Sequence, residues 1–217
     1  MRFVDELLHK AAAEGEDLEL KRALQNTNGD PRLADENGIT PLMQAAKGGH
    51  TNCITHLLDF GADIHARDKQ GRTALYHAAE NGRAGAVQLL MEKGGSPIVR
   101  DNVNKTPLHA ACDKGDLATV ETLATYKYLI DYLGPEDRTP LMQAAIAGHA
   151  EVVKLLAAKG ADLKATCSAG MSAADYAHIC GNREAEIALE SLSVTSVFAG
   201  GVTKRMKVRA PIQLKKK

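Results

Sequence analysis

One short pattern of apolar and polar positions recurs along the chain, most clearly at residues 106–111, Thr-Pro-Leu-His-Ala-Ala. An apolar anchor follows a Thr or Ser by two residues in every copy. The anchors lie 33 residues apart, at Leu42, Leu75, Leu108, Leu141 and Ala174. The anchor and the small residues after it would form the buried stripe of a short helix. A fixed period of this size is typical of a stacked array in which each unit contacts only its neighbours.

Each fuller copy carries the signals of a helix that begins and ends in the same way. A threonine is placed to cap the first turn, and a proline often follows where no backbone donor is lost: Thr40, Thr73, Thr106 and Thr139, with Pro41, Pro107 and Pro140. A glycine then ends the helix in the left-handed conformation, at Gly49, Gly82, Gly115 and Gly148. Apolar spacings such as Val152, Val153 and Leu156 predict a second helix. A β-turn such as residues 68–71 leads to the next unit.

This period and the Thr-Pro-Leu-His pattern resemble the ankyrin repeat. The resemblance covers about residues 5–193. It implies an all-α ankyrin-repeat solenoid of stacked helix-turn-helix units with β-turn tips. We divide the chain into an N-terminal capping repeat, four repeats, a C-terminal capping repeat and a basic disordered tail, at 3–35, 36–68, 69–101, 102–134, 135–167, 168–193 and 194–217.

The two capping repeats depart from the pattern, as terminal units of an array do. In the first, a helix is predicted from about Asp17 to Gln25, with Leu18, Leu20 and Leu24 as its buried positions. In the last, the final helix is predicted from about Arg183 to Leu192, and no helical or strand period follows it.

The repeat at 102–134 also diverges, because Lys127 stands where other units have a helix-ending glycine. Loss of that glycine should perturb the end of the second helix. Three of the five tyrosines fall here, at Tyr126, Tyr128 and Tyr132. Two interpretations remain open. The tyrosines cover the adjacent core of a remodelled loop, which we favour, or they form an aromatic recognition patch.

Charge is unevenly distributed although the chain is formally neutral. Residues 194–217 hold seven basic groups and no acid, which leaves 20 basic against 27 acidic residues in the rest. The four cysteines form no C-x-x-C pair, acidic residues precede any apolar run that a signal peptide would need, and no apolar run is long enough to span a membrane. We therefore expect an intracellular, soluble protein in the cytoplasm.

Histidines and cysteines give no support for catalysis. His109 occupies a position that holds Met43, Tyr76 or Met142 in other units, which indicates packing. His50 and His149 recur at the repeat period, which favours structural roles. Cys53, Cys112, Cys167 and Cys180 lack the spacing of a zinc site, and each is most simply a small buried residue. No phosphate loop, nucleophile elbow or paired-carboxylate motif is present. We predict no enzyme, cofactor, metal or small-molecule substrate.

The surface positions outside the pattern are the candidates for binding another protein, which is the usual role of ankyrin arrays. Our predicted set lies on the central turns and first helices: Lys69, Gln70, Arg72, Asn102, Val103, Lys105, Asp113, Lys114, Glu136 and Arg138. Other such positions include Asn37, Ile39, Lys47 and Glu80. Five of the set form a mildly basic strip on an acidic body, so we expect a partner with an acidic or polar segment.

We predict a protein-binding adaptor, scaffold or stoichiometric inhibitor that works through a concave face and the turn tips. The alternative function is a nuclear or nucleic-acid-associated regulator acting through residues 204–209 of the tail. In that case the protein would be found in the nucleus as well as in the cytoplasm. The tail could also fold back on the acidic body or have no function. Binding of nucleic acid is expected only through the basic tail.

Overall fold

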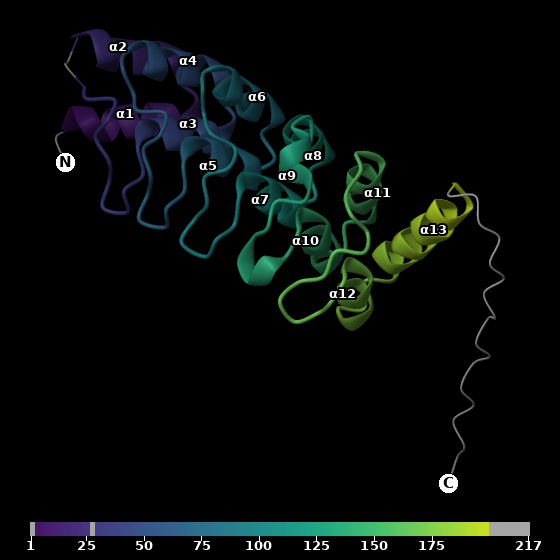
Figure 1. Cartoon of the computed structure of the whole chain (residues 1–217). Helices are drawn as coiled ribbons and strands as arrows, with labels where there is room; N and C mark the ends of the chain where they lie inside the picture. Colours follow the sequence, from purple (N-terminus) through teal and green to yellow (C-terminus); the bar gives the residue numbers. More distant parts are fainter. Residues whose placement is uncertain (1–2, 27–28, 200–217) are drawn as a thin grey trace.

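The computed structural model describes residues 3–26 and 29–199, and the regular secondary structure in these residues is helical. One row consists of first helices: α1 (Phe3–Glu14), α3 (Pro41–Gly48), α5 (Ala74–Glu80), α7 (Pro107–Lys114), α10 (Pro140–Ala147) and α12 (Ala173–Ile179). The other row consists of second helices: α2 (Asp17–Asn26), α4 (Thr51–Asp59), α6 (Ala84–Glu92), α8 (Leu117–Leu123), α11 (Ala150–Ala158) and α13 (Arg183–Ala199). The loops between units project beyond the first helices on one side of the stack (Figure 1). The predicted all-α solenoid is confirmed.

Threonine hydroxyls begin the first helices as predicted. Thr40, Thr73 and Thr139 each accept a hydrogen bond from the backbone N–H three residues later, at 3.3–3.4 Å. Thr106 instead hydrogen-bonds to the His109 side chain. The capping hydroxyl satisfies a donor that the helix itself leaves unpaired.

The core is a continuous apolar layer between neighbouring helix pairs. The anchors Leu42, Leu75, Leu108 and Leu141 are at most 1% exposed, and the alanine pairs beside them are also buried. Each first helix packs against the first helix of the next unit. Small alanine side chains let these short helices approach closely, so burial between repeats holds the array together.

Two expectations about the capping repeats were wrong. Leu18 is 71% exposed, whereas Leu20 and Leu24 are buried. Residues two apart lie on opposite sides of a helix, so Leu18 cannot share the face of Leu20 and Leu24. The final helix continues past Leu192 to Ala199, because no glycine or proline interrupts it before Gly200. The rest of the predicted tail, residues 200–217, lies outside the described residues.

The divergent repeat changes as expected at the end of its second helix. Helix α8 has seven residues against nine in α4, α6 and α11, and a short helix α9 (Lys127–Ile130) follows it. Leu129 and Ile130 of α9 cover the core, while Tyr126 and Tyr128 are 43% and 58% exposed. The favoured core-covering interpretation is therefore wrong for these two tyrosines. Their rings contact each other edge to face, with centroids 5.9 Å apart.

The helices of the described part do not include one that is both long and apolar enough to cross a membrane.

Candidate functional site

Each central turn tip is closed by an aspartate at its base. One carboxylate oxygen of Asp68 accepts from the backbone N–H groups of Gln70 and Arg72, at 2.9 and 2.8 Å. Asp101 accepts in the same way from Val103 and Lys105, at 3.1 and 2.7 Å. An aspartate that bonds backbone donors two and four residues later fixes the local turn, so the tips present their side chains from defined positions.

Neighbouring tips are also joined to each other. The backbone N–H of Lys69 donates to the Asn37 carbonyl oxygen at 2.9 Å, and that of Asn102 donates to the Gln70 carbonyl oxygen at 2.8 Å. The Asn102 side chain adds a 2.9 Å bond to the Lys69 carbonyl oxygen. The tips at Asn37, residues 68–72 and residues 101–105 therefore form one continuous row.

The next tip is built differently because Gly134 replaces the aspartate. Residues Pro135–Asp137 form a single 3-10 turn (η1), in which Glu136 and Asp137 have positive φ values of 55° and 58°. The Asn104 side chain donates to the Gly134 carbonyl oxygen at 3.1 Å and connects this tip to the row. This tip is thus joined to its neighbour by a side-chain hydrogen bond, whereas the earlier tips are joined by backbone hydrogen bonds.

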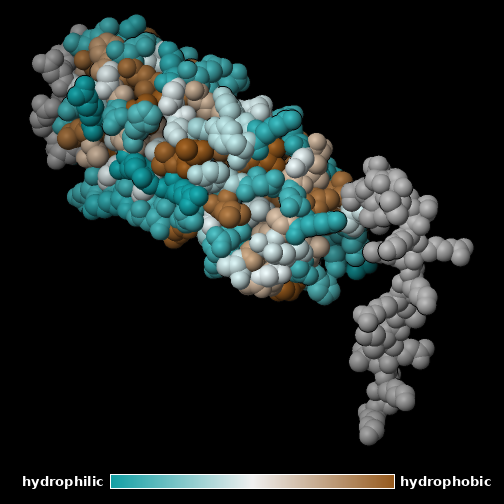
Figure 2. Space-filling view, in the orientation of Figure 1, coloured by the Kyte–Doolittle hydropathy of each residue, from teal (hydrophilic) through white to brown (hydrophobic). Residues whose placement is uncertain are grey.

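The ten predicted binding residues fall into two groups. Six are exposed: Lys69, Gln70, Asn102, Val103, Lys114 and Glu136. Four are half-buried and engaged by other side chains: Arg72, Lys105, Asp113 and Arg138. All ten lie on the turn tips or first helices, and we call this surface the inner face. Figure 2 shows hydrophilic side chains along the row of tips and hydrophobic patches on the surface above it.

The predicted basic strip is largely neutralised by its own neighbours. Lys105 pairs with Asp113 at 2.5 Å, and the Arg138 guanidinium pairs with Glu136. Arg138 also donates to the Tyr176 hydroxyl at 3.2 Å and stacks over its ring. Sequence spacing could have found the first pair, since position eight residues after Lys105 is acidic. The strip is therefore less basic than the sequence count implied.

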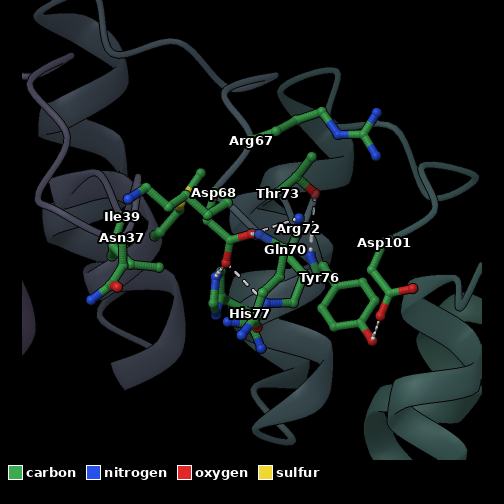
Figure 3. Close-up of polar contacts among 12 residues, drawn as sticks. Asn37, Ile39, Arg67, Asp68, Gln70, Arg72, Thr73, Tyr76, His77 and Asp101 are labelled. Atoms are coloured by element: carbon green, nitrogen blue, oxygen red, sulfur yellow. Dashed lines mark hydrogen bonds and ion pairs between the residues drawn. The ribbon is translucent and has the colours of Figure 1, made fainter. Parts of the chain in front are cut away.

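Asp68 is the centre of a denser cluster in α5 and the loop before it. Its second carboxylate oxygen accepts from Arg72 Nε and from His77 Nε2, each at 2.9 Å (Figure 3). Arg72 also pairs with Glu80 at 3.4 Å. Burial alone would raise the pKa of Asp68, but the hydrogen bonds and charge of Arg72 and the bond from His77 outweigh it and lower that pKa. Burial, together with the charge of Arg72, lowers the pKa of His77. The cluster therefore holds an ionised Asp68 and a neutral His77 near pH 7.

Two hollows open on the inner face. The larger, about 380 Å³, lies between the first two full repeats and is lined by Asn37, Ile39, Met43, Gln44, Lys47, Asp68, Lys69, Gln70, Arg72 and His77. The smaller, about 250 Å³, lies between the second and third and is lined by Tyr76, Glu80, Lys105, Ala110, Asp113 and Lys114. Gln44 and His77 were not among our candidates. Each stands nine residues after a turn aspartate, Asp35 or Asp68, and that recurrence was the available signal.

His50 and His149 each connect neighbouring repeats, which agrees with the structural roles expected for them. His50 Nε2 lies 3.1 Å from the Ala13 carbonyl oxygen, and His149 Nε2 lies 3.0 Å from that of Asp113. His109 is completely buried. Three cysteines are buried, but Cys180 is exposed, against our expectation, because it follows the last turn of α12 beyond its packed face. Within residues 3–26 and 29–199, His, Cys, Asp and Glu side chains do not gather into a group of three suited to a metal.

The fold matches that of solved structures, including two whose chains are 27–28% identical to this one. One is a chain of the complex of the predatory endopeptidase Bd0816 from Bdellovibrio bacteriovorus with immunity protein Bd3460, with TM-score 0.76 and 28% identity. The other is EF0377, an ankyrin repeat protein, with TM-score 0.73 and 27% identity. Each similarity covers 86% of this chain and 97% of the other.

Sequence comparison gives a shorter match to a curated protein, the 26S proteasome non-ATPase regulatory subunit 10 of Dictyostelium discoideum. The two are 41% identical over 56 residues, which is 26% of this chain. The chain spans about a quarter of the length of that relative, 24%.

The family model for ankyrin repeats in three copies matches residues 8–101, 56–132 and 97–167. Together these matches run from the first capping helix to the end of the fourth full repeat and cover well over half of the chain. Proteins built from such repeats are binding modules for other proteins. With its stacked helix pairs, glycine-ended first helices and linked turn tips, the chain belongs to the ankyrin repeat family.

Proposed function

We propose that this chain binds a folded protein partner in a fixed stoichiometry through the inner face, the concave surface predicted from the sequence. The observation that carries the proposal is the continuous row of turn tips from Asn37 to residue 105. Its backbone is held by bonds between tips, and Lys69, Gln70, Asn102 and Val103 project from it exposed. A rigid surface loses little conformational entropy on binding, so its contacts contribute efficiently to affinity.

Among the three roles, we favour a stoichiometric inhibitor over an adaptor or a scaffold. The support is the similarity to a chain of the endopeptidase–immunity protein complex, which extends over 86% of this chain. The Dictyostelium relative, a regulatory subunit of the 26S proteasome, supports a link to proteolytic machinery over a shorter segment. We therefore propose an endopeptidase as the class of partner and a non-enzymatic mode of action, in which the bound array occludes the peptidase.

The test is affinity capture from native lysate with four baits. These are the full chain, residues 1–199, a tip variant and an outer variant. The truncation ends at residue 199 because a cut at 193 would shorten α13. The tip variant changes exposed inner-face residues to Ala: Lys69, Gln70, Asn102, Val103 and Lys114. The outer variant changes exposed polar residues of the second helices to Ala: Gln88, Glu121 and Lys154.

The proposal expects a partner that the truncation and the outer variant retain and the tip variant loses. Light scattering of the purified complex should give a fixed ratio of subunits. If the partner is a peptidase, its activity should fall linearly with added chain to an end point at that ratio. Retention of the partner by the tip variant would contradict the inner face as the site. Loss only on truncation would favour the alternative function through the basic segment.

That alternative has its own test. Residues 204–209 lie outside the described residues, so a nuclear or nucleic-acid-associated role remains a prediction from the sequence. Binding of the full chain to generic duplex DNA should then weaken steeply with salt, and residues 1–199 should not bind. Absence of DNA binding at low salt would remove the nucleic-acid form of this hypothesis.

A further inference from the structure

The larger hollow of the inner face is lined by both apolar and polar side chains. Ile39 and Met43 form the apolar part, and Asn37, Gln44 and Gln70 bring side-chain amides to the edge. Lys47 and Lys69 are exposed beside it. We call this feature the α3/α5 hollow, because it lies between α3 with its preceding turn and α5 with its preceding turn.

One repeated position distinguishes the junction at the α3/α5 hollow from the two junctions that follow. In the next repeat, the Tyr76 hydroxyl reaches across the junction and donates to Asp101 at 2.9 Å (Figure 3). In the repeat after that, His109 crosses the junction to the Arg138 carbonyl oxygen at 3.0 Å. Met43 occupies the same position in α3, and its thioether cannot form an equivalent bond to Asp68. The first junction therefore lacks the side-chain bridge from this position that the second and third have, and its hollow is larger than the one at the second junction.

The charges around the hollow are unbalanced. Asp68 is the acidic residue of the lining, and its carboxylate is already engaged by Arg72 and His77 at 2.9 Å each. Among the described residues, no carboxylate pairs with Lys47 or Lys69. With His77 neutral, the residues that line the hollow include three basic groups, Lys47, Lys69 and Arg72, and one acidic group, Asp68. Arg72 is paired with Asp68 and with Glu80 outside the lining, so the α3/α5 hollow presents two lysines, Lys47 and Lys69, that no described carboxylate neutralises.

The smaller hollow provides the contrast. Its lining contains Lys105 and Lys114 against Glu80 and Asp113, so its charges balance. Lys105 and Asp113 are in contact at 2.5 Å, which leaves that lysine less able to attract another anion. An acidic group passing along the inner face would therefore meet a favourable field at the α3/α5 hollow and none at the smaller one.

We propose that the α3/α5 hollow is the recognition subsite for an acidic side chain of the protein partner. A glutamate or aspartate there would place its carboxylate near Lys47 and Lys69, with the amides of Asn37, Gln44 and Gln70 around it and its methylene groups on the half-buried Ile39. This inference rests on the proposed function, because it assigns a partner chemistry to one part of the inner face. It moves the expected acid-binding region from the central strip to the first junction between full repeats.

The probe is a hexapeptide of glutamate, with a length-matched hexapeptide of serine as the uncharged control. Each is added to the ¹⁵N-labelled full chain, and backbone and side-chain amide shifts are followed by NMR. The glutamate peptide should shift the amides of Asn37, Gln44, Lys69 and Gln70, and the serine peptide should not. The affinity should fall as salt is raised, because both lysines are exposed to solvent.

The hollow variant is Gln44→Glu with Lys47→Glu, and its matched control is Gln88→Glu with Lys154→Glu on the second helices. Both pairs change net charge equally. The hollow variant should weaken binding of the glutamate peptide about tenfold or more, and the control should retain most of it. A milder Lys47→Gln variant should weaken binding several-fold if the double variant proves unstable. Equal loss in hollow and control variants, or shifts spread over every lysine-bearing surface, would overturn the subsite.

The same variants separate this inference from the proposed function, since neither Gln44 nor Lys47 belongs to the tip variant. A captured partner lost by both the tip and hollow variants supports both proposals. A partner lost by the tip variant and kept by the hollow variant leaves the binding surface in place and rejects the acidic subsite. A partner kept by the tip variant rejects the proposed function, whatever the peptide does.

Discussion

His109 in α7 donates a hydrogen bond from Nε2 to the backbone carbonyl oxygen of Arg138, at 3.0 Å, and so connects one repeat to the next. Its other ring nitrogen, Nδ1, accepts from the Thr106 hydroxyl at 2.7 Å. The ring is completely buried. The neutral imidazole with its proton on Nε2 satisfies both bonds, whereas the charged form would bury a positive charge.

This contact predicts that stability falls in mild acid. Burial lowers the pKa of His109 to about 4 from an ordinary value of 6.5, although the bond to Arg138 partly opposes the shift. Between these values the unfolded chain binds more protons than the folded one, so the free energy of unfolding should decrease as pH falls through this window. The contribution of His109 should reach about 3 kcal/mol. Urea unfolding at pH 7, 6, 5 and 4 measures it.

His109→Met is the matched variant, because Met43 and Met142 occupy the same position in other repeats. It should lose stability at pH 7 but show a shallower pH dependence between 6.5 and 4. His77, whose pKa is also lowered, remains in both proteins, so the difference between the two slopes isolates His109. Identical slopes would show that His109 does not titrate in this window.

The anchor leucines should each contribute strongly to stability. Leu75 and Leu108 are at most 1% exposed, so replacement by Ala should lower the free energy of unfolding by roughly 2–5 kcal/mol through lost burial and a residual cavity. Leu18, at 71% exposed, is the control and should cost less than about 0.5 kcal/mol. Denaturant unfolding of the three variants measures these values. A small effect at Leu75 or Leu108 would contradict the packing of the array.

The sequence predicted the repeated parts of the fold well because every repeat restates the same physical constraints. The threonine cap, the anchor leucine and the helix-ending glycine each recur at the repeat period, so the helix bounds inferred from one repeat can be checked against the others. Leu18 was wrongly assigned to the buried face because the capping helix departs from the repeat pattern, so no other repeat shows which of its faces is buried. The end of α13 was missed because a helix can continue after its apolar period fades, until residues such as Gly200 and Gly201 intervene.

The candidate surface was predicted less completely, since charge counting ignores pairing. The sequence placed Lys105 and Arg138 on the right side of the array, and the acidic position eight residues after Lys105 was a signal that the charge count did not use. The ion pair of Arg138 with Glu136 depends on the unusual turn at residues 135–137, which the sequence analysis did not predict. The difference between the first two junctions depends on Met43, which cannot form the bridge that Tyr76 forms one repeat later. That comparison becomes meaningful only when the partner of Tyr76, Asp101, is known.

Cysteine reactivity should separate the four thiols. Cys180 is exposed and should react first with iodoacetamide, while the buried Cys53 and Cys112 should be protected in the folded chain. Burial raises the pKa of Cys53 to about 11 and also raises that of Cys112, which further suppresses their thiolates. Intact-mass spectrometry should show one rapid adduct, absent from Cys180→Ser. Several rapid adducts in that variant would contradict the predicted burial.

Two glycines with left-handed backbones should tolerate alanine differently. Gly115 has a φ of 77°, and a Cβ there would lie 2.5 Å from ring atoms of His149. Gly94 has a φ of 94°, and its Cβ would meet nothing within 4 Å. Gly94→Ala should therefore cost only the backbone strain, about 1 kcal/mol. Gly115→Ala adds a steric clash and should cost about 2–4 kcal/mol in urea unfolding.

A double-mutant cycle identifies the source of that difference. His149 Nε2 bonds to the Asp113 carbonyl oxygen at 3.0 Å, so its ring cannot move away from Gly115 without losing this connection between repeats. In a His149→Ala background the clash is gone, and the additional cost of Gly115→Ala should fall to the value found at Gly94. If the cost stays the same in both backgrounds, the penalty at Gly115 comes from its backbone, and His149 plays no part in it.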